Sequence, residues 1–267
     1  MNPTDFQELL WEEARTRYRD MPWRRDTQPY YVLVSEIMLQ QTQVDRVIPK
    51  FEAFIAAFPT VEALAAAPLS EVLKLWSGLG YNRRAKFLHE AAKKIATEFN
   101  GEFPNTQEGL IGLPGVGVNT AGAILAYSFS QPAIFIETNV RTVYFHHYFD
   151  DAETVTDKEL REVVEATIDH EHPREWYWGI MDYGSYLKRQ GVGRNDKSHH
   201  YKKQSALKGS VREVRGAILK VLALEDGMTA EALRKATHDD DRFEVALSGL
   251  LRDGLVVKTG QQLHLAD

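Results

Sequence analysis

Two carboxylates stand in unusually apolar surroundings in this sequence. Glu36 lies within YYVLVSEIMLQQT (30–42), and Glu137 directly follows the apolar run AIFI. Burial raises the pKa of a carboxyl group, so a glutamate in a pocket can hold or deliver a proton near neutral pH. One carboxylate that protonates and a second that faces a developing positive charge can together break a bond to a sugar carbon. From position alone, Glu36 could instead lie on an exposed helical stripe, and Glu137 could cap a helix that begins near Asn139.

A glycine-rich turn precedes a helical pattern in LPGVGVNTAGAIL (113–125). Gly115 and Gly117 can adopt backbone angles that other residues avoid, so the chain can turn tightly and direct successive N–H groups outward at a helix start. Such an arrangement binds a phosphate or another anion. The same GxG pattern is also typical of an ordinary helix-to-helix turn with a glycine cap.

Basic residues concentrate in two segments of a chain whose net charge is −6. This net charge argues against indiscriminate coating of nucleic acid, although a local patch can still bind phosphates. The longer segment spans residues 188–208 and contains Lys188, Arg189, Arg194, Lys197, Lys202, Lys203 and Lys208. The shorter one follows the sequence GLGYN and contains Arg83, Arg84 and Lys86. Either segment taken alone could be an ordinary solvated surface.

The composition limits the cofactors and the location. Of 267 residues, 43% are hydrophobic and 26% are charged, which is typical of one large or two modest packed domains. The chain contains no cysteine, so disulfides and cysteine-ligated iron–sulfur clusters are excluded. No apolar run reaches membrane-spanning length, and the acidic, amphipathic start of the chain is unlike a signal peptide. We therefore expect a monomeric, cytoplasmic protein with no membrane partner.

Apolar residues recur at helical spacing through most of the chain. The repeats of three and four residues predict helices over 31–41, 51–57, 61–66, 70–76, 84–97 and 119–129. Strand-like alternation is almost absent before residue 188, and prolines and glycines separate the helical stretches. We therefore expect a helical core over residues 1–187 and a basic loop or linker over 188–208.

A second, smaller domain is expected over residues 209–267. VREVRGAILKVLAL, TAEALRKAT and DRFEVALSGLLRDGLV each have a helical pattern, and VVKTGQQLHLA has two alternating runs around a Thr-Gly turn. Three helices and a β-hairpin predict a winged helix, a module that often binds DNA. Acidic residues, Asp239 to Asp241 and Glu244, lie near its expected recognition helix, so a packing or protein-contact role is an equal alternative.

Five motifs in a fixed order now point to a known family. They are MPW (21–23), SEIMLQQTQV (35–44), GLGYNRRA (78–85), LPGVGVNTAGAIL (113–125) and ETNVRTV (137–143). With them the chain resembles the helix-hairpin-helix DNA glycosylases of the endonuclease III superfamily, above all the adenine DNA glycosylase branch. The resemblance covers residues 20–187 and implies a mainly α fold, with two helical lobes and the active site between them.

The resemblance implies roles for particular residues. In this family the glutamate of the SE(V/I)MLQQT motif, here Glu36, protonates the adenine, and the second glutamine, here Gln41, fills the space of the flipped nucleotide. The hairpin binds a DNA phosphate through main-chain amides, commonly with a monovalent cation, which Leu113 and Val116 would hold through their backbone. The further residues implied or inferred to contact DNA are Tyr81, Asn82, Arg83, Gly115, Val116, Gly117, Asn119, Thr120, Lys188 and Arg189.

The chain departs from the family pattern at several of these positions. Glu137 replaces the aspartate that stabilises the cationic sugar, while Asn139 matches the asparagine beside it. Asn119 replaces the lysine with which bifunctional relatives form a Schiff base, so simple hydrolysis is expected. Asn82 replaces a second tyrosine of the adenine branch. The four-cysteine cluster loop and the Nudix-like domain are also missing, and we infer that residues 188–208 supply phosphate contacts in place of the cluster loop.

We therefore expect a monofunctional DNA glycosylase of base excision repair that acts on double-stranded DNA without a cofactor. Its expected substrate is adenine opposite 8-oxoguanine or guanine, flipped out of the helix. One alternative is a glycosylase for mismatched thymine or uracil, or for a damaged pyrimidine. Another is a DNA-binding protein that senses lesions or mismatches but has lost its chemistry.

Overall fold

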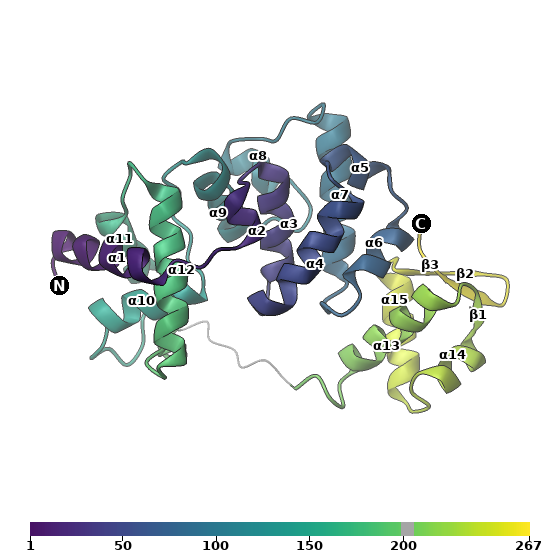
Figure 1. Ribbon diagram of the computed structural model, residues 1–267. Helices are drawn as coiled ribbons and strands as arrows, with labels where there is room; N and C mark the ends of the chain where they lie inside the picture. The colour runs from purple at the N-terminus through teal and green to yellow at the C-terminus, as the bar shows by residue number, and fades with distance from the viewer. Residues whose placement is uncertain (199–205) are drawn as a thin grey trace. The chain divides into compact units, whose positions relative to one another are not determined.

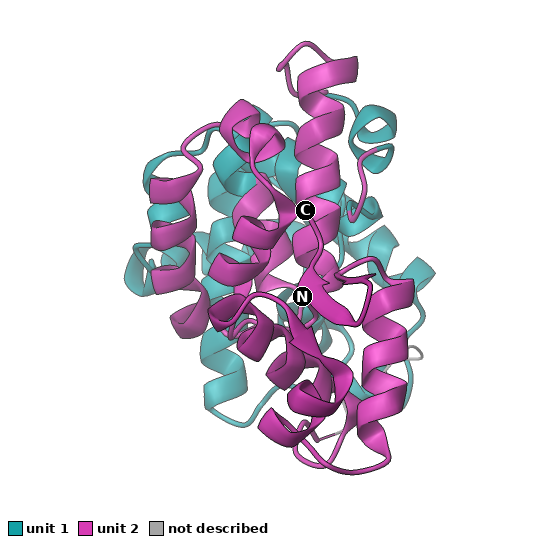
Figure 2. Ribbon diagram, turned by 90° about the vertical axis from the view of Figure 1, so that its right-hand side faces the viewer, with its two compact units in different colours: residues 1–32, 105–112, 116–203 teal, residues 33–104, 113–115, 204–267 magenta. Residues whose placement is uncertain are grey.

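The protein is mainly helical and carries one small antiparallel sheet near its C-terminus, as the computed structural model of residues 1–198 and 206–267 shows (Figure 1). The mainly α fold expected from the sequence is therefore confirmed. The contacts divide the chain into two compact units (Figure 2). Unit 1 comprises residues 1–32, 105–112 and 116–203, and unit 2 comprises residues 33–104, 113–115 and 204–267. Among the described residues, no helix is both long and apolar enough to cross a membrane.

Unit 1 is built around the long helix α12, against which α1, α9 and α10 pack. Its aromatic core includes Phe6, whose ring centroid lies 5.0 Å from that of Tyr144 and 6.0 Å from that of Trp176. All three side chains are completely buried. The elements of this unit are α1 (Pro3–Arg17), α2 (Pro22–Arg25), α8 (Gln107–Ile111), α9 (Val118–Phe129), α10 (Thr138–Tyr148), α11 (Asp157–Thr167), α12 (Pro173–Arg189) and the 3₁₀ turn η1 (Asn195–Lys197).

A buried ion pair fastens the start of the chain to α12 within unit 1. The carboxylate of Asp182 accepts hydrogen bonds from Arg24 at 2.7 and 3.0 Å and from the Arg19 side chain at 2.5 Å. The side chains of Arg24 and Asp182 are only 3% and 2% exposed. Because both charges are shielded from water and mutually satisfied, this pair holds the MPW segment against α12.

Unit 2 begins within α3 (Pro29–Leu39) and continues with a helical lobe. In this lobe α5 and α6 pack against α7, and α4 packs against α6. Phe54 and Trp76 lie in its core, with ring centroids 6.3 Å apart. The remaining helices of the lobe are α4 (Val44–Ala57), α5 (Val61–Ala66), α6 (Leu69–Trp76) and α7 (Arg83–Glu98).

The predicted winged helix is present in the same compact unit. Its elements are α13 (Val211–Leu224), β1 (Met228–Thr229), α14 (Ala230–Ala236), α15 (Arg242–Arg252), β2 (Val256–Thr259) and β3 (Gln262–Leu265). The strands form an antiparallel sheet in the order β1-β3-β2, with Val256 opposite Leu265. The sequence pattern missed β1, because a two-residue strand is too short to show alternation. Contacts of α13 and β3 with α6 join the winged helix to the helical lobe.

The basic segment 188–208 is more ordered at its start than the sequence suggested. Helix α12 runs through Lys188 to Arg189, and η1 packs against α10. Lys197 is only 3% exposed, and its ammonium donates to the carbonyl of Phe149 at 3.0 Å. The expected loop or linker therefore contains the last two residues of α12 and the turn η1, and the carbonyl of Phe149 fixes Lys197 in place. Lys202 and Lys203, two of the basic residues of this segment, lie outside the described residues.

Candidate functional site

Glu36 lies in α3 among side chains that are almost entirely shielded from solvent. Its neighbours Ser35 and Ile37 are fully buried, as are Leu33 and Val34 just before them. Glu36 itself is partly exposed. A carboxyl group on such a helix can face a pocket while its backbone is fixed by the packed core, which suits a proton donor.

Two residues with unusual backbone angles follow in the same unit. Gln41, just beyond α3, has φ = 56°, and Tyr81, in the GLGYN loop, has φ = 46°. Left-handed angles cost a residue other than glycine of the order of 1–3 kcal/mol and tend to occur at functional sites. Both side chains are exposed, Tyr81 to 37%. The strain therefore coincides with two of the positions expected to contact DNA.

Arg84 joins the end of α3 to the GLGYN loop. Its Nη1 donates to the carbonyls of Ile37, Met38 and Gln40 at 2.8, 2.9 and 2.7 Å. Its Nη2 donates to the carbonyl of Gly80 at 3.0 Å, so one guanidinium caps the helix and holds the loop. Burial lowers the pKa of Arg84 to about 10, which leaves it charged at neutral pH. The interpretation of Arg84 as part of a solvated basic run is wrong, because this side chain is buried.

The two residues beside it remain near the surface. Arg83 is 60% exposed, and its Nε lies 3.8 Å from Asp253 of the winged helix. Asn82 occupies the position before α7 without a side-chain cap hydrogen bond. Arg83 is thus exposed but close to a carboxylate, and the DNA contacts of both residues stay predictions.

The structure requires glycine at only one of the two glycine positions of the hairpin. Gly115 has φ = 77°, and a Cβ there would lie 2.8 Å from the Cβ of Phe87. Gly117 has φ = −93°, with nothing within 4 Å of its Cβ position. The expectation that both need glycine-specific angles is thus wrong for Gly117, which adopts ordinary extended backbone at the N-cap of α9. Val118 follows it at the helix start and is 46% exposed.

Asn119 fixes the segment that leads to Glu137. Its Nδ2 donates to the carbonyl of Ile136 at 3.0 Å, and its Oδ1 accepts from the N–H of Ile136 at 3.1 Å. These paired bonds consume one face of the amide and align the residue directly before Glu137. Asn119 therefore positions the second carboxylate within unit 1, and a DNA contact by its side chain stays a prediction, as does one by Thr120 in the next position.

The charges of Glu137 and Lys188 influence each other within unit 1, although no ion pair joins their side chains among the described residues. Glu137 stands at the N-cap of α10, but its side chain makes no capping hydrogen bond. Burial raises the pKa of its carboxyl group, and the positive charge of Lys188 opposes this rise. Burial also lowers the pKa of Lys188 to about 8, against the effect of Glu137. Lys188 thus lies in α12 as the charge partner of Glu137, whereas its neighbour Arg189 is exposed.

Asn139 lies in the first turn of α10, where that helix closely approaches α12. A Cβ on Gly184 would lie 2.7 Å from the carbonyl oxygen of Asn139. The Nδ2 of Asn139 lies 3.4 Å from the sulfur of Met181, a weak contact that leaves most of its hydrogen-bonding capacity unused. The glycine in MDYGSYL therefore allows the two helices to meet beside Glu137 and Asn139.

Residues 34–167 match the family model described as HhH-GPD superfamily base excision DNA repair protein. Adenine DNA glycosylase of Mycobacterium tuberculosis is 33% identical over 278 residues, which cover 96% of this chain and 91% of that protein. The chain belongs to the HhH-GPD superfamily. The resemblance to its adenine DNA glycosylase branch is thus confirmed.

Other relatives in the superfamily match a shorter part of their own length. Adenine DNA glycosylase of Buchnera aphidicola subsp. Baizongia pistaciae is 37% identical over 170 residues, or 63% of this chain and 48% of that protein. For the human adenine DNA glycosylase the identity is 38% over 189 residues, or 66% of this chain and 34% of that protein. The chain therefore spans about half the length of the Buchnera relative and about a third of the human one.

Solved structures agree with the superfamily fold. The structure of a thermostable thymine-DNA glycosylase has a TM-score of 0.64 and 28% identity, covering 68% of this chain and 86% of that chain. An endonuclease III bound to DNA has a TM-score of 0.58 at 21% identity, covering 70% of this chain and 87% of that chain, and supports the fold alone.

Metal binding has no side-chain basis in the part of the chain that the structure describes. No group of three or more His, Cys, Asp or Glu residues there could hold a metal ion. A hairpin cation would instead be held by main-chain carbonyls of Leu113 and Val116, whose side chains are 2% and 5% exposed. That cation stays a prediction.

Sequence reasoning on this HhH-GPD chain missed the residues that support the site. Arg84, Gly184 and the Lys188 partnership act through contacts with distant segments, so local patterns carried no signal for them. The sequence marked Arg83 and Arg84 only as a basic pair after GLGYN and did not show which of the two is buried.

Proposed function

We propose that this chain is a monofunctional DNA glycosylase that releases adenine paired with 8-oxoguanine or guanine in duplex DNA. The observation that carries the proposal is Glu36, a carboxylic acid on a buried helix that Arg84 ties to the strained loop of Tyr81. Its relatives named adenine DNA glycosylase support the choice of base, and one of them aligns with 96% of this chain.

The residues suggest how the reaction would proceed. Glu36 would donate a proton to the departing base, which weakens the N-glycosidic bond. The ionised carboxylate of Glu137 would stabilise the developing cationic sugar, and water would then attack the sugar carbon. Asn119 provides no amine for a Schiff base, so the product would be an abasic site.

A single-turnover assay tests this proposal. Labelled duplexes with adenine, thymine or uracil opposite guanine or 8-oxoguanine are incubated with excess protein, with and without a final alkali step. We expect strand cleavage at adenine only after alkali, and a loss of at least about 100-fold in rate for Glu36→Gln, since general acid catalysis contributes about 10²–10⁴-fold. A Glu36→Gln protein that retains the full rate would refute the mechanism.

A second candidate is release of thymine or uracil from mispairs with guanine. It is supported by the likeness to the thymine-DNA glycosylase structure and by Asn82, which differs from the adenine branch. In the same assay, release of thymine or uracil without adenine would favour this candidate. DNA binding without any base release would instead favour the non-catalytic alternative.

A further inference from the structure

A groove of about 1400 Å³ runs along unit 2 between the helical lobe and the winged helix. Gln41 and Tyr81 line one side, together with the start of α7. Helix α13 and the end of α15 line the other side. The groove therefore includes Gln41, which the resemblance places at the flipped nucleotide, and Tyr81, which is expected to contact DNA.

The groove is strongly cationic on a chain whose net charge is −6. Besides the buried Arg84, its cations are Arg46, Arg83, Arg212, Arg215, Lys220 and Arg252, and its acids are Glu213 and Asp253. Both acids are already engaged. Asp253 pairs with Arg215 at 2.6 Å, and Glu213 pairs with Arg242, outside the groove lining, at 3.0 Å.

Two of these cations stand open to solvent. Lys220 near the end of α13 and Arg252 at the end of α15 are exposed. Among the residues that the structure describes, neither has an ion pair with a carboxylate. Their charges are therefore solvated and can pair with phosphates, a contact that is favoured by the release of counterions from DNA.

Arg212 connects the winged helix to the loop of Tyr81. It donates a hydrogen bond to the Tyr81 hydroxyl, and its guanidinium carbon lies 5.2 Å from the centre of the tyrosine ring. A cation over an aromatic face is attracted to it, so α13 holds the tyrosine expected to contact DNA.

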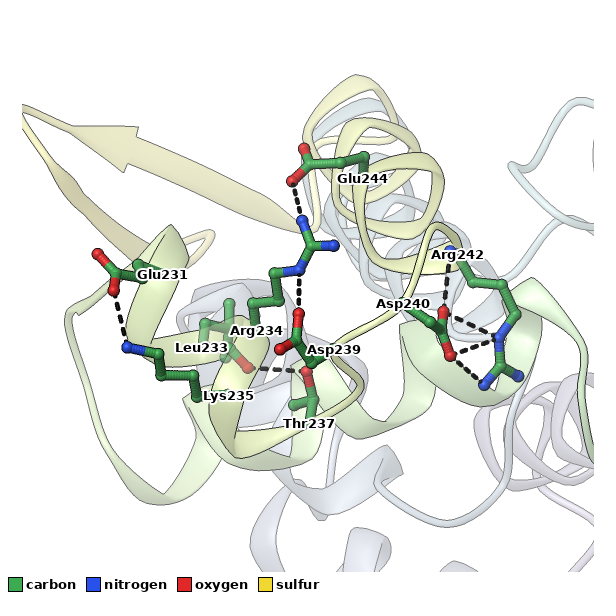
Figure 3. Close-up of polar contacts among 9 residues, drawn as sticks. All are labelled: Glu231, Leu233, Arg234, Lys235, Thr237, Asp239, Asp240, Arg242 and Glu244. Carbon is green, nitrogen blue, oxygen red and sulfur yellow. Dashed lines mark hydrogen bonds and ion pairs between the residues drawn. The ribbon is translucent and has the colours of Figure 1, made fainter.

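On α14 and the start of α15, charged side chains of the winged helix pair with one another (Figure 3). Arg234 pairs with Asp239 at 2.6 Å and with Glu244 at 3.4 Å. Lys235 pairs with Glu231 at 2.7 Å. Helix α15 also places Glu244 on this surface, so a phosphate would meet carboxylates here. The surface formed by α14 and the start of α15 therefore offers a phosphate few free positive charges.

We propose that the cationic groove binds the DNA phosphate backbone beside the flipped nucleotide, with α13 as the DNA-contacting helix of the winged helix. This inference rests on the proposed function for the identity of its ligand. Lys220 and Arg252 contact phosphates, and Arg212 holds Tyr81 at the junction. The residues of this self-neutralised surface, Glu231, Arg234, Lys235, Asp239 and Glu244, are not among those that line the groove.

The test compares the double variant Lys220→Ala, Arg252→Ala with the matched control Lys235→Ala, an exposed lysine of α14 outside the groove lining. Binding of a duplex is measured by fluorescence anisotropy from 50 to 200 mM salt, conditions chosen because phosphate contacts are strongly salt-dependent, with thermal unfolding as a check on the fold. Each lost phosphate contact lowers the slope of log affinity against log salt by about 0.9, so we expect a decrease of about 2. The control should keep the wild-type slope.

The result is independent of whether bases are released. A lowered slope supports the groove even if the wild-type protein releases no base, in which case the proposed activity alone fails. A wild-type slope in a folded double variant, or an equal loss in the control, overturns the inference even if base release is normal.

Discussion

Arg84 carries a guanidinium that usually binds a carboxylate or a phosphate, but here it donates to main-chain carbonyls. The carbonyls of Ile37, Met38 and Gln40 lie at or just beyond the end of α3, where a helix runs out of N–H donors, and the guanidinium donates to all three. The same side chain holds Gly80 before Tyr81. The placement of Gln41 and Tyr81 thus depends on one residue that need not touch DNA.

Arg84→Lys should destabilise the protein by about 2–4 kcal/mol, because an ammonium cannot span both sets of carbonyls and leaves buried acceptors unsatisfied. It should also slow base release more than it weakens substrate binding. Urea unfolding and single-turnover rates measure the two effects. Arg83→Lys is the matched control and should change stability by less than about 0.5 kcal/mol. Equal behaviour of the two variants would contradict the role of Arg84.

The Lys188 charge supports the ionised form of Glu137 against the effect of burial. Lys188→Met removes that support, so the pKa of Glu137 should rise further. Base release should then be lost at a higher pH on the acid side of its pH–rate profile. Single-turnover rates measured across that acid side give the shift, and Arg189→Met should not move the profile. If the acid side of the pH–rate profile is the same in Lys188→Met as in the wild type, Lys188 does not affect the ionisation of Glu137.

At the scale of elements, the approach of α10 to α12 determines where Glu137 and Asn139 are presented. Gly184 lies at the crossing, and an added Cβ would also lie 2.8 Å from the Cβ of Asn139. Since the obstructing atoms include backbone, the helices rather than a flexible side chain would have to move. The close packing of α12 at Gly184 therefore fixes the start of α10, where Glu137 and Asn139 lie.

Gly184→Ala should cost about 1–3 kcal/mol of stability despite the higher helix propensity of alanine. It should also reduce base release by displacing the start of α10. Gly216→Ala in α13 is a suitable comparison, because nothing lies within 4 Å of its Cβ position. That variant should be neutral or more stable by up to about 1 kcal/mol. Chemical unfolding measures the stability of both variants. A Gly184→Ala protein as stable as Gly216→Ala would refute the clash.

At the scale of the whole molecule, long-range polar contacts close unit 1. Asp182 receives Arg19 and Arg24 from segments about 160 residues earlier in the chain. In unit 2, Lys86 of α7 donates to the carbonyl of Asp253 at 2.9 Å, so the last domain is tied to the helical lobe. Segments distant in sequence thus complete each unit.

Asp182→Ala should destabilise the protein by about 3–5 kcal/mol, because it leaves the buried Arg24 charge without a partner. The exposed pair Arg25 with Asp20 offers a contrast, and Asp20→Ala should leave the stability nearly unchanged, because solvent screens this pair. Thermal and urea unfolding of both variants measure the difference. Similar small losses would show that the buried pair contributes little.

The sequence by itself determined the helical class, the winged helix and the positions of Glu36, Gln41 and Glu137. Helical periodicity, turn residues and short motifs are local properties, so the order of residues is enough to reveal them. Only the tertiary structure decided that Arg84 is buried, that Lys188 accompanies Glu137, and that α13 lines a cationic groove. These features depend on contacts between segments that are distant in the sequence. Such contacts form only when the chain folds, so local patterns do not reveal them.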